Sequence, residues 1–411
     1  MFPAQTACCP TLAVTAEPSG VSLSTLAVHG GRQPNPYGAV TTPVVSSAPT
    51  VFPNTTALRA FVEARRQQRT EQVEYGRYGN PTIREAERRL AALEGAEDAL
   101  LLASGMAAVT TALLAWLPPA AHVVLTDGVY RRTRQFVGEL LPRWGFSVSV
   151  WRWGTGERLA DVLRPETALI LAEAPTNPYL RVLDLAALTA VARERGILTV
   201  VDATFATPIN LRPLTWGVDL VIHSATKYLG GHHDLLAGVV AGRRAWVQPV
   251  REMLGVLGGV SSAATAALLT RGLRTLGVRM AQHNRNGQAV AEFLEGHPAV
   301  AQVWYPGLPS HPDHTVARRQ MSGFGGVVSF TLRGGLEETS RFVDALRIPL
   351  LAASLGGVES LVTLPALASY YNLSAEERLA LGIPDNLVRL SLGVEDTNDL
   401  LDDLAQALGR I

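Results

Sequence analysis

The amino-acid sequence predicts an α/β protein with a mostly parallel sheet, helices on both faces of that sheet, and a smaller α+β domain at the C-terminal end. Its 411 residues are enough for two domains with a large core. A hydrophobic content of 47% beside 18% charged residues is typical of a folded chain. From residue 81 onward, short apolar runs alternate with longer amphipathic stretches, which is the pattern of strands and helices in βα units.

The first 80 residues are predicted to lie outside the compact domains. Residues 1–22 are expected to be a disordered tail. Residues 23–80 combine Pro-containing extended pieces with one Arg-rich helix near Leu58–Arg69, which is typical of an arm rather than of a domain. Asn80 is suited to cap a helix and Pro81 to be its first residue, so a helix is predicted from Pro81 to about Leu93.

The large domain is predicted over residues 81–283 and the small domain over residues 284–411. After its first helix, the large domain is predicted to contain, in order, strand Ala99–Leu102, helix Met106–Trp116, strand Val123–Leu125, helix Tyr130–Leu140, strands Ser147–Trp151 and Ala168–Glu173, helix Leu185–Arg195, and strands Leu198–Asp202 and Leu220–His223. The small domain is predicted to contain helices near Gln288–Glu295 and Glu338–Leu346, and strands near Val327–Thr331 and Leu387–Leu392.

Charge and hydropathy argue against several classes of partner. The chain carries 36 basic and 36 acidic residues, so it offers no broad basic surface for nucleic acid. The uncharged stretch Ala99–Thr126 is long enough for a membrane span, but Ser104-Gly105 and Pro118-Pro119 interrupt it, so we expect no membrane insertion. Nothing in the sequence has the spacing of a metal site, and none is predicted.

Cysteine content and the start of the chain predict the compartment. Cys8 and Cys9 are the only cysteines, and adjacent residues in a tail are poorly placed for a structural disulfide. The absence of a predicted structural disulfide indicates a protein of a reducing compartment. Residues 1–20 carry no Arg or Lys, which argues against a secretory signal and an Arg-rich transit peptide. We therefore expect a cytoplasmic protein.

Lys227 is the only lysine, beside 35 arginines, in this chain. Almost every position that needs only a positive charge is therefore arginine. A buried amine can lose its proton and attack a carbonyl, whereas a guanidinium stays protonated. Lys227 is thus a candidate for Schiff-base chemistry. The alternative is a surface lysine whose rarity reflects coding bias.

The neighbours of Lys227 favour the chemical role. Lys227 follows the predicted strand Leu220–His223, at the edge of the sheet where open α/β proteins bind ligands. Ser224 and Thr226 place hydroxyls there that suit a phosphate. Asp202 ends a neighbouring strand, where its carboxylate can pair with a pyridinium nitrogen. An amine, phosphate-binding hydroxyls and a carboxylate together suit pyridoxal 5′-phosphate, PLP.

Four motifs carry a resemblance to a known family. They are residues 74–82 (EYGRYGNPT), 130–134 (YRRTR), 202–208 (DATFATP) and 385–389 (DNLVR). With the lysine motif, they resemble the cystathionine γ-synthase family, the fold type I PLP-dependent enzymes of cysteine and methionine metabolism, and are most similar to its plant-type members. The resemblance runs from about residue 24 to the end. It implies the PLP-dependent transferase fold type I, which is aspartate aminotransferase-like, with residues 81–283 as the PLP-binding domain.

The resemblance implies a phosphate site with two sources. Backbone N–H groups of Gly105 and Met106, at the start of a helix, would bind the phosphate together with the hydroxyls named above. Tyr75 and Arg77 would reach the same phosphate from a neighbouring subunit. The arm would then contact that subunit, in a homotetramer built from dimers with shared active sites. A surface loop is the alternative interpretation of Tyr75 and Arg77.

The resemblance also assigns residues around the cofactor ring. Tyr130 would stack on the ring, an arrangement in which offset aromatic contact is favourable. Asp202 would keep the ring nitrogen protonated, so that the ring draws electrons from the substrate. Asn177 would lie near the ring hydroxyl, with turn chemistry before Pro178 as its alternative explanation.

The substrate residues rest on the resemblance as well. Arg389 would bind the α-carboxylate of the amino acid, and Ser354 lies in the loop beside the active site. Glu74, which begins the first motif, is assigned to substrate binding. Arg132 stands where plant-type members carry lysine, and its guanidinium could bind an anionic γ-substituent. An exposed helix start is the alternative for Arg132.

These residues imply a PLP-dependent γ-replacement, in which cysteine and an activated homoserine ester form cystathionine on the route to methionine. Lys227 would act as general base and acid, and Tyr75 and Tyr130 are candidates to assist it. The alternatives are a γ-lyase acting on cystathionine or methionine, a sulfhydrylase using sulfide, and a non-catalytic PLP-fold regulator. Many bacterial-type γ-synthases and γ-lyases of the family carry a glutamate where this chain has Ala353, and methionine γ-lyases carry a cysteine where it has Arg132. Both departures argue against the lyase. The acetyl, succinyl and phosphoryl esters all remain open.

Overall fold

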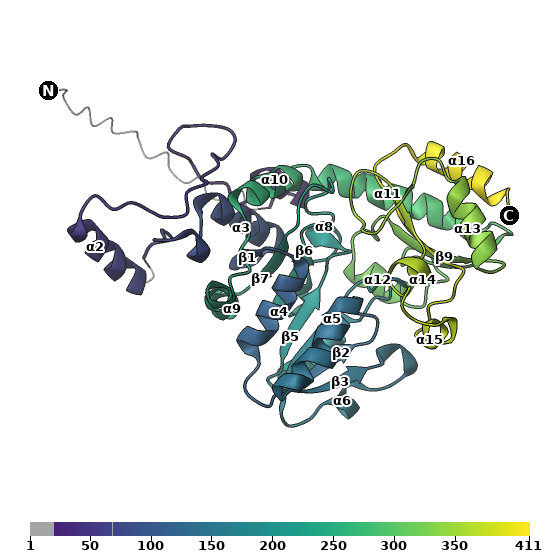
Figure 1. The fold of residues 1–411 in the computed structure, drawn as a ribbon, viewed down its shortest axis with the longest axis horizontal. Helices are drawn as coiled ribbons and strands as arrows, with labels where there is room; N and C mark the ends of the chain where they lie inside the picture. Colours follow the sequence, from purple (N-terminus) through teal and green to yellow (C-terminus); the bar gives the residue numbers. More distant parts are fainter. Residues whose placement is uncertain (1–19, 68) are drawn as a thin grey trace.

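The computed structural model describes residues 20–67 and 69–411, and it confirms the predicted α/β class. The described residues form two sheets, one of seven strands and one of five. Figure 1 shows the larger sheet with its helices, the smaller C-terminal sheet beside it, and an N-terminal arm carrying α2 that extends away from both. The predicted tail at residues 1–19 and both cysteines lie outside the described residues.

The large sheet has the order β1-β7-β6-β5-β4-β2-β3, and the run from β6 to β3 is parallel. β7 is antiparallel to both of its neighbours. Every residue of β1, β2 and β7 is buried, as expected of strands covered on both faces. The strands are β1 (Asp98–Leu102), β2 (His122–Thr126), β3 (Ser147–Trp151), β4 (Thr167–Glu173), β5 (Leu198–Asp202), β6 (Leu220–Ser224) and β7 (Gly238–Gly242).

Helices cover both faces of this sheet through separate hydrophobic clusters. One face packs against α4 (Gly105–Trp116), α9 (Arg244–Leu257) and the residues following α5 (Arg131–Gln135). The opposite face packs against α3 (Pro81–Glu94) at one end and α7 (Leu185–Glu194) at the other. α10 (Ala263–Leu273) lies against α3. The sheet is therefore the middle layer of three, and its carboxyl edge is left for the site.

The small sheet has the order β10-β11-β12-β9-β8. Its strands are β8 (Val300–Trp304), β9 (Val327–Leu332), β10 (Leu350–Leu351), β11 (Leu361–Thr363) and β12 (Leu387–Ser391). α11 (Leu276–Glu295), α13 (Leu336–Ala345) and α16 (Thr397–Leu408) contribute to its core. The shorter helices are α6 (Leu159–Val162), α8 (Thr207–Asn210), α12 (His314–Gln320), α14 (Pro365–Ala368), α15 (Ala375–Ala380), the π-helical turn Phe136–Leu140, and the 3₁₀ turns Gly76–Tyr78, Leu141–Trp144, Trp153–Thr155 and Pro213–Trp216.

The arm contains more helix than the sequence predicts. α1 (Leu23–His29), which the prediction had as extended chain, is capped by the Ser22 hydroxyl. α2 (Thr55–Arg66) begins three residues before the predicted start at Leu58, because the Asn54 side chain accepts a hydrogen bond from the Ala57 N–H and caps the helix there. α3 begins at Pro81 with Asn80 as its cap, as predicted.

The segment that follows β6 was the least predictable. β7, α9 and α10 were missed, and the division at residues 283/284 falls inside α11, which starts at Leu276 rather than near Gln288. Polar residues interrupt the apolar pattern of α11, and some of them form tertiary hydrogen bonds: His283 Nδ1 lies 2.8 Å from the Leu392 carbonyl, and Asn286 donates to the Gly393 carbonyl. In the described part of the chain, no helix is long and apolar enough to cross a membrane.

Candidate active site

Lys227 lies at the carboxyl edge of the large sheet, three residues beyond β6. Its Nζ donates a hydrogen bond to Ser354 Oγ at 2.7 Å. Ser354 belongs to the loop between β10 and β11 of the small sheet, and its φ of +103° is in the region that non-glycine residues rarely adopt. The two domains therefore meet at the lysine, and the backbone strain at Ser354 falls beside it.

The surroundings of Lys227 favour its neutral form. Burial, as the larger cause, and the nearby Arg389 guanidinium together lower the pKa of the ammonium from 10.5 to about 8. An amine with this pKa is half deprotonated at pH ~8, whereas an ordinary lysine is almost fully charged there. Lys227 is thus placed to act as a nucleophile and as a base near neutral pH.

We expect this pKa to be directly measurable, because the chain has no other lysine. Reductive ¹³C-methylation of the folded apoprotein should give one lysine signal, which titrates in NMR spectra with a pKa of about 8. Arg389→Leu should raise that pKa, since it removes the second cause of the shift. An unshifted lysine pKa in wild type would contradict the assignment, and exposed Arg318→Ala serves as the control that leaves the pKa unchanged.

Asp202 ends β5 with one carboxylate oxygen bonded and the other available. Thr204 donates both its N–H, at 3.0 Å, and its hydroxyl, at 2.5 Å, to Asp202 Oδ1. No hydrogen-bond partner for Oδ2 occurs among the residues that the structure describes. Burial raises the pKa of Asp202, while the Thr204 hydrogen bonds lower it. Oδ2 therefore fits the N–H of a protonated ring.

Glu173 and Thr204 are site residues that the sequence analysis missed. Glu173 ends β4 directly opposite Asp202, and its Oε2 accepts a hydrogen bond from the Tyr130 N–H at 2.7 Å. Burial and the neighbouring Asp202 raise the pKa of Glu173 well above its ordinary value. Glu173 thus positions the backbone of Tyr130. Glu173 could have been predicted from the sequence, since it is a polar residue at the carboxyl end of an apolar strand, as Asp202 is.

The start of α4 provides backbone donors beside Ser224. Ser104 Oγ accepts a hydrogen bond from the Ala107 N–H, which caps α4 and leaves the N–H groups of Gly105 and Met106 without intrahelical partners. A Cβ at Gly105 would come within 2.8 Å of the Ser224 Cβ, so only glycine permits this approach. The backbone N–H groups and the Ser224 hydroxyl together fit a phosphate group.

The hydroxyls of Thr226 and Ser224 differ in whether they already form hydrogen bonds within the protein. The Thr226 hydroxyl accepts from the Ala237 N–H at 3.0 Å and lies 3.3 Å from the Ala237 carbonyl. The Ser224 N–H donates to Thr204 Oγ1 at 2.8 Å, and the Ser224 hydroxyl itself has no hydrogen-bond partner among the described residues. Thr204 therefore connects the Asp202 carboxylate to the Ser224 end of the site.

Arg389 is a buried cation in β12 with no acidic partner among the described residues. Its guanidinium donates to Asn177 Oδ1 and to the Ser354 carbonyl, both at 3.0 Å, while Nε is buried without a partner. Burial lowers the pKa of Arg389 to about 10. A buried charge that lacks a counter-ion is costly, so the carboxylate of an amino-acid ligand is the partner that this guanidinium fits.

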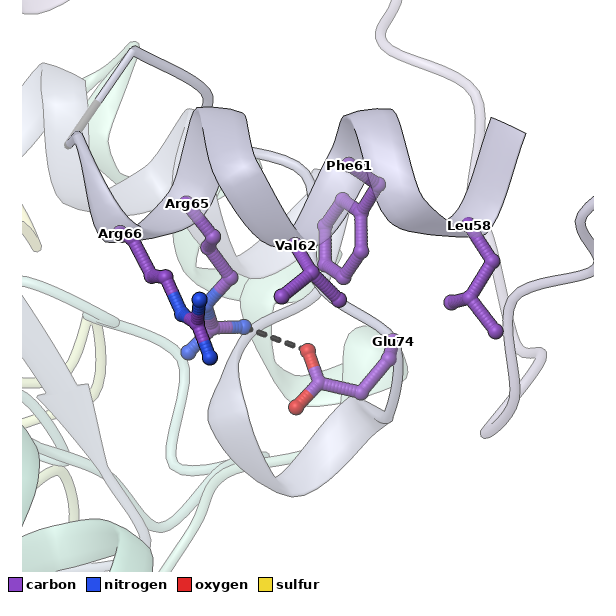
Figure 2. Close-up of a pocket in the computed structure, with 6 residues that line it drawn as sticks. All are labelled: Leu58, Phe61, Val62, Arg65, Arg66 and Glu74. Carbon is purple, nitrogen blue, oxygen red and sulfur yellow. Dashed lines mark hydrogen bonds and ion pairs between the residues drawn. The ribbon is translucent and has the colours of Figure 1, made fainter. Parts of the chain in front are cut away.

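The predicted residues of the arm lie apart from this cluster within one chain. Figure 2 shows Glu74 paired with Arg65 of α2, at 2.6 Å. The Arg77 guanidinium donates to the Gly255 carbonyl at 3.2 Å and lies over the Tyr78 ring. Tyr75 is 46% exposed. Among the described residues, no hydrogen bond or ion pair joins any of the three predicted arm residues to the site around Lys227.

The arginines after Tyr130 point to different surroundings. Arg132 is exposed and donates to Gln135 at 2.7 Å, one turn along the same helix. Arg131 and Arg134 are half-buried and, three positions apart, share a face of α5. Within one chain, Arg132 therefore has the contacts of an exposed helix start, and its assignment to the substrate stays a prediction.

The residues present fit PLP. An amine, a carboxylate with a free oxygen, backbone donors at the start of α4 and the 45%-exposed ring of Tyr130 are supplied by the large domain. The uncompensated guanidinium and the strained serine come from the small domain.

Comparisons with known proteins agree with this chemistry. The sequence model described as Cys/Met metabolism PLP-dependent enzyme matches residues 24–409. A chloroplastic cystathionine gamma-synthase of Arabidopsis thaliana is 47% identical over 390 residues, which cover 94% of this chain and 69% of the relative. A cystathionine gamma-lyase of Dictyostelium discoideum is 38% identical, covering 96% of this chain and 99% of the relative.

A solved structure extends the similarity to three dimensions. It is the cystathionine gamma synthase of Xanthomonas oryzae pv. oryzae in complex with aminoacrylate and cysteine, which matches with a TM-score of 0.88 at 40% identity. The match covers 95% of this chain and 98% of that one. It confirms the predicted fold type I architecture.

Proposed function

The chain belongs to the Cys/Met metabolism PLP-dependent enzymes, and from that premise we propose that it acts as a cystathionine γ-synthase, exchanging the γ-ester group of an activated homoserine for the thiol of cysteine. The observation that carries the proposal is the pairing of Lys227 with Arg389 through Ser354. A nucleophilic amine and an uncompensated guanidinium held by one residue suit an α-amino acid, which presents an amine and a carboxylate on one carbon.

Arg389 binds the α-carboxylate of the substrate in this mechanism. Its two donating nitrogens are held by Asn177 and by the Ser354 carbonyl, so the guanidinium plane is fixed before the substrate arrives. The buried position of Arg389 keeps water from competing for the carboxylate. The α-carbon of the bound amino acid is thereby oriented toward the lysine side of the site.

Lys227 moves the protons. PLP, when bound, supplies an electron-withdrawing ring that acidifies the α-carbon of the substrate. The neutral Lys227 amine, favoured by its lowered pKa, takes the proton from the α-carbon and then exchanges protons with the neighbouring carbons. Ser354 Oγ, 2.7 Å from Nζ, holds the amine in position during these transfers. Loss of the ester group and addition of the thiol complete the replacement.

A product assay tests the function. The purified holoenzyme is incubated with the acetyl, succinyl and phosphoryl esters of homoserine, each with cysteine and, separately, with sulfide. Cystathionine formed from at least one ester and cysteine is the expected product. Homocysteine formed with sulfide only would identify a sulfhydrylase. Release of ammonia and a keto acid as the main activity, in a separate incubation with cystathionine alone, would identify a lyase. Absence of every product would contradict an enzymatic role.

We infer further that the enzyme assembles into a homotetramer built from dimers, and that the two subunits of each dimer share their active sites. The arm carries several exposed apolar residues, including Val40, Val51 and, on α2, Leu58 and Val62. Figure 2 shows Leu58 and Val62 on one side of α2, toward the segment that carries Glu74. Apolar surface of this kind on an extended segment favours burial against another subunit. Tyr75 and Arg77 would then complete a neighbour's phosphate site.

Subunit mixing tests the shared site. Arg77→Ala and Lys227→Ala homomers should each be inactive, whereas hybrids formed by exchange should regain activity, because one site in each hybrid dimer draws only wild-type residues from both subunits. Arg69→Ala mixed with Lys227→Ala is the control, since Arg69 lies in the same arm outside the motif. If exchange is demonstrated and activity does not return, the sites are not shared.

We also infer a cytoplasmic location from the cysteine content, which favours a reducing compartment. The Arabidopsis relative is named chloroplastic, so that relative differs from this inference in compartment. Fractionation of the source cells with an antibody against the protein would test it, and recovery in a periplasmic or membrane fraction would contradict it.

A further inference from the structure

A cleft opens beside the lysine, between the chain that follows Lys227 and the small domain. Its volume is about 540 Å³. Residues 233–236 line it from the large domain, and residues 352–354 line it from the small domain. Ser354 and Thr226 both belong to the lining, and Ser354 Oγ lies 2.7 Å from Lys227 Nζ. The cleft therefore adjoins the place where the lysine reacts.

The lining of this cleft is mostly apolar, with few polar side chains. Apart from the hydroxyls of Thr226 and Ser354, the polar groups among the described lining residues are the imidazole of His233 and the carboxylate of Asp234. The remaining lining side chains are leucines and alanines. Apolar walls with a small number of placed polar groups are typical of sites that bind small molecules.

The backbone is strained at two positions in the lining. The φ angle is +56° at His233 and +103° at Ser354, in the region that non-glycine residues rarely adopt. Five non-glycine residues of the described chain have a positive φ, and these two line the same cleft. Strain of this kind is costly and clusters at functional sites, so it supports a binding role for the cleft.

The small domain holds the imidazole of His233 in place. Its Nε2 lies 3.8 Å from Glu359 Oε2. A Cβ at Gly357 would come within 1.9 Å of the same nitrogen, so only glycine leaves room for the ring. Nδ1 has no hydrogen-bond partner among the described residues, and the side chain is 27% exposed. The ring is thus fixed on one side and open to a ligand on the other.

Asp234, the next residue, brings an anion to the same cleft. Its carboxylate is exposed and forms no hydrogen bond or ion pair with any residue that the structure describes. A carboxylate accepts hydrogen bonds from an ammonium, and an imidazole N–H donates to a carboxylate. An α-amino acid presents an ammonium and a carboxylate on one carbon, so two neighbouring residues of this kind suit it.

We propose that this cleft binds the acceptor amino acid, with its α-ammonium at Asp234, its α-carboxylate at His233 and its thiol toward Ser354 and Lys227. The inference rests on the proposed function. Arg389 is occupied by the carboxylate of the homoserine ester, so the acceptor needs polar partners of its own. The leucine and alanine side chains of the lining suit the methylene group and the sulfur of cysteine.

Truncated acceptors test which residue binds which group. Cysteamine lacks the carboxylate of cysteine, and 3-mercaptopropionate lacks the ammonium. Asp234→Asn should raise KM about fivefold to tenfold for cysteine and cysteamine, but less than about twofold for 3-mercaptopropionate. His233→Asn, chosen because asparagine tolerates a positive φ, should raise KM for cysteine and 3-mercaptopropionate and spare cysteamine. In both variants, KM for the ester should not change.

Asp402→Asn is the matched control. Asp402 is an exposed aspartate of α16 that also has no printed partner among the described residues, and it does not line the cleft. Its kinetic constants should equal those of wild type with every acceptor. A rise in KM for the ester as large as that for cysteine, or equal effects on the two truncated acceptors in both variants, would overturn the assignment.

A binding titration separates this proposal from the proposed function. Holoenzyme reduced with borohydride, which blocks turnover, is titrated with cystathionine, whose cysteine half reaches the cleft, and with norleucine, which resembles the donor half alone. Asp234→Asn should bind cystathionine about fivefold to tenfold more weakly and norleucine as wild type does. This holds even if no ester gives cystathionine, an outcome that would contradict the function alone. Equal weakening of both ligands, unchanged binding of both, or loss of cofactor would overturn the role of the cleft.

Discussion

Replacing Lys227 with alanine is expected to lower kcat by about four orders of magnitude or more, the upper range for removal of a general acid–base group. The loss should be as severe in Lys227→Arg, because a guanidinium retains the charge but neither attacks a carbonyl nor gives up its proton. The chain offers no second lysine to take over either task. Turnover of the ester that wild type uses, measured with cysteine as acceptor, checks the result.

Peptide mapping shows whether the cofactor is attached where this prediction requires. Borohydride reduction of the wild-type holoenzyme should fix the cofactor to a single peptide containing Lys227, with no label in the Lys227→Ala variant. Exposed Arg318→Ala, which removes a long cationic side chain from the surface, should retain full activity and labelling. Label confined to the N-terminal amine, or appreciable turnover in either lysine variant, would contradict the role of Lys227.

Asp202→Asn is expected to lower kcat about a thousandfold, on the scale of breaking a buried charge pair. The amide oxygen can keep both hydrogen bonds from Thr204, so the local geometry is retained while the charge is lost. At the free position, an NH₂ group would replace the oxygen that accepts from the protonated ring. Turnover and the absorption spectrum of the bound cofactor should change together.

A matched control shows whether the effect comes from losing the carboxylate in the site or from losing any carboxylate. Asp161→Asn alters an exposed aspartate of α6 in the same way, and its activity should equal that of wild type. Thr204→Val should fall between the two, because it removes the hydroxyl that lowers the pKa of Asp202 while keeping the carboxylate. Activity of Asp202→Asn within tenfold of wild type would show that the carboxylate does not support the ring.

Local features of the sequence were sufficient to predict the large-domain half of the site. Lys227, Ser224 and Asp202 each lie at or just beyond the end of a short apolar strand, and parallel strands bring their carboxyl ends to one edge. The capped start of α4 was visible as Ser104-Gly105 after an apolar run. These are short-range patterns, so their consequences do not depend on how distant segments pack.

Other parts of the molecule depended on contacts that no local pattern encodes. α11 is continuous across the predicted domain division, and its buried residues His283 and Asn286 find partners at Leu392 and Gly393, more than 100 residues away. Glu173 acquires its role only because β4 and β5 pair with Glu173 opposite Asp202.

Fold class and family could be read from the sequence and its motifs, and the lysine chemistry was predicted from the same residues. The folded structure was needed to show that Ser354 contacts Lys227, and that Arg389 binds Asn177 with no acidic partner among the described residues. The physical reason is range. Helix caps, strand ends and motif chemistry act over a few residues, whereas the contacts of Ser354 and Arg389 join residues 127 and 212 positions apart and form only when the two domains pack together.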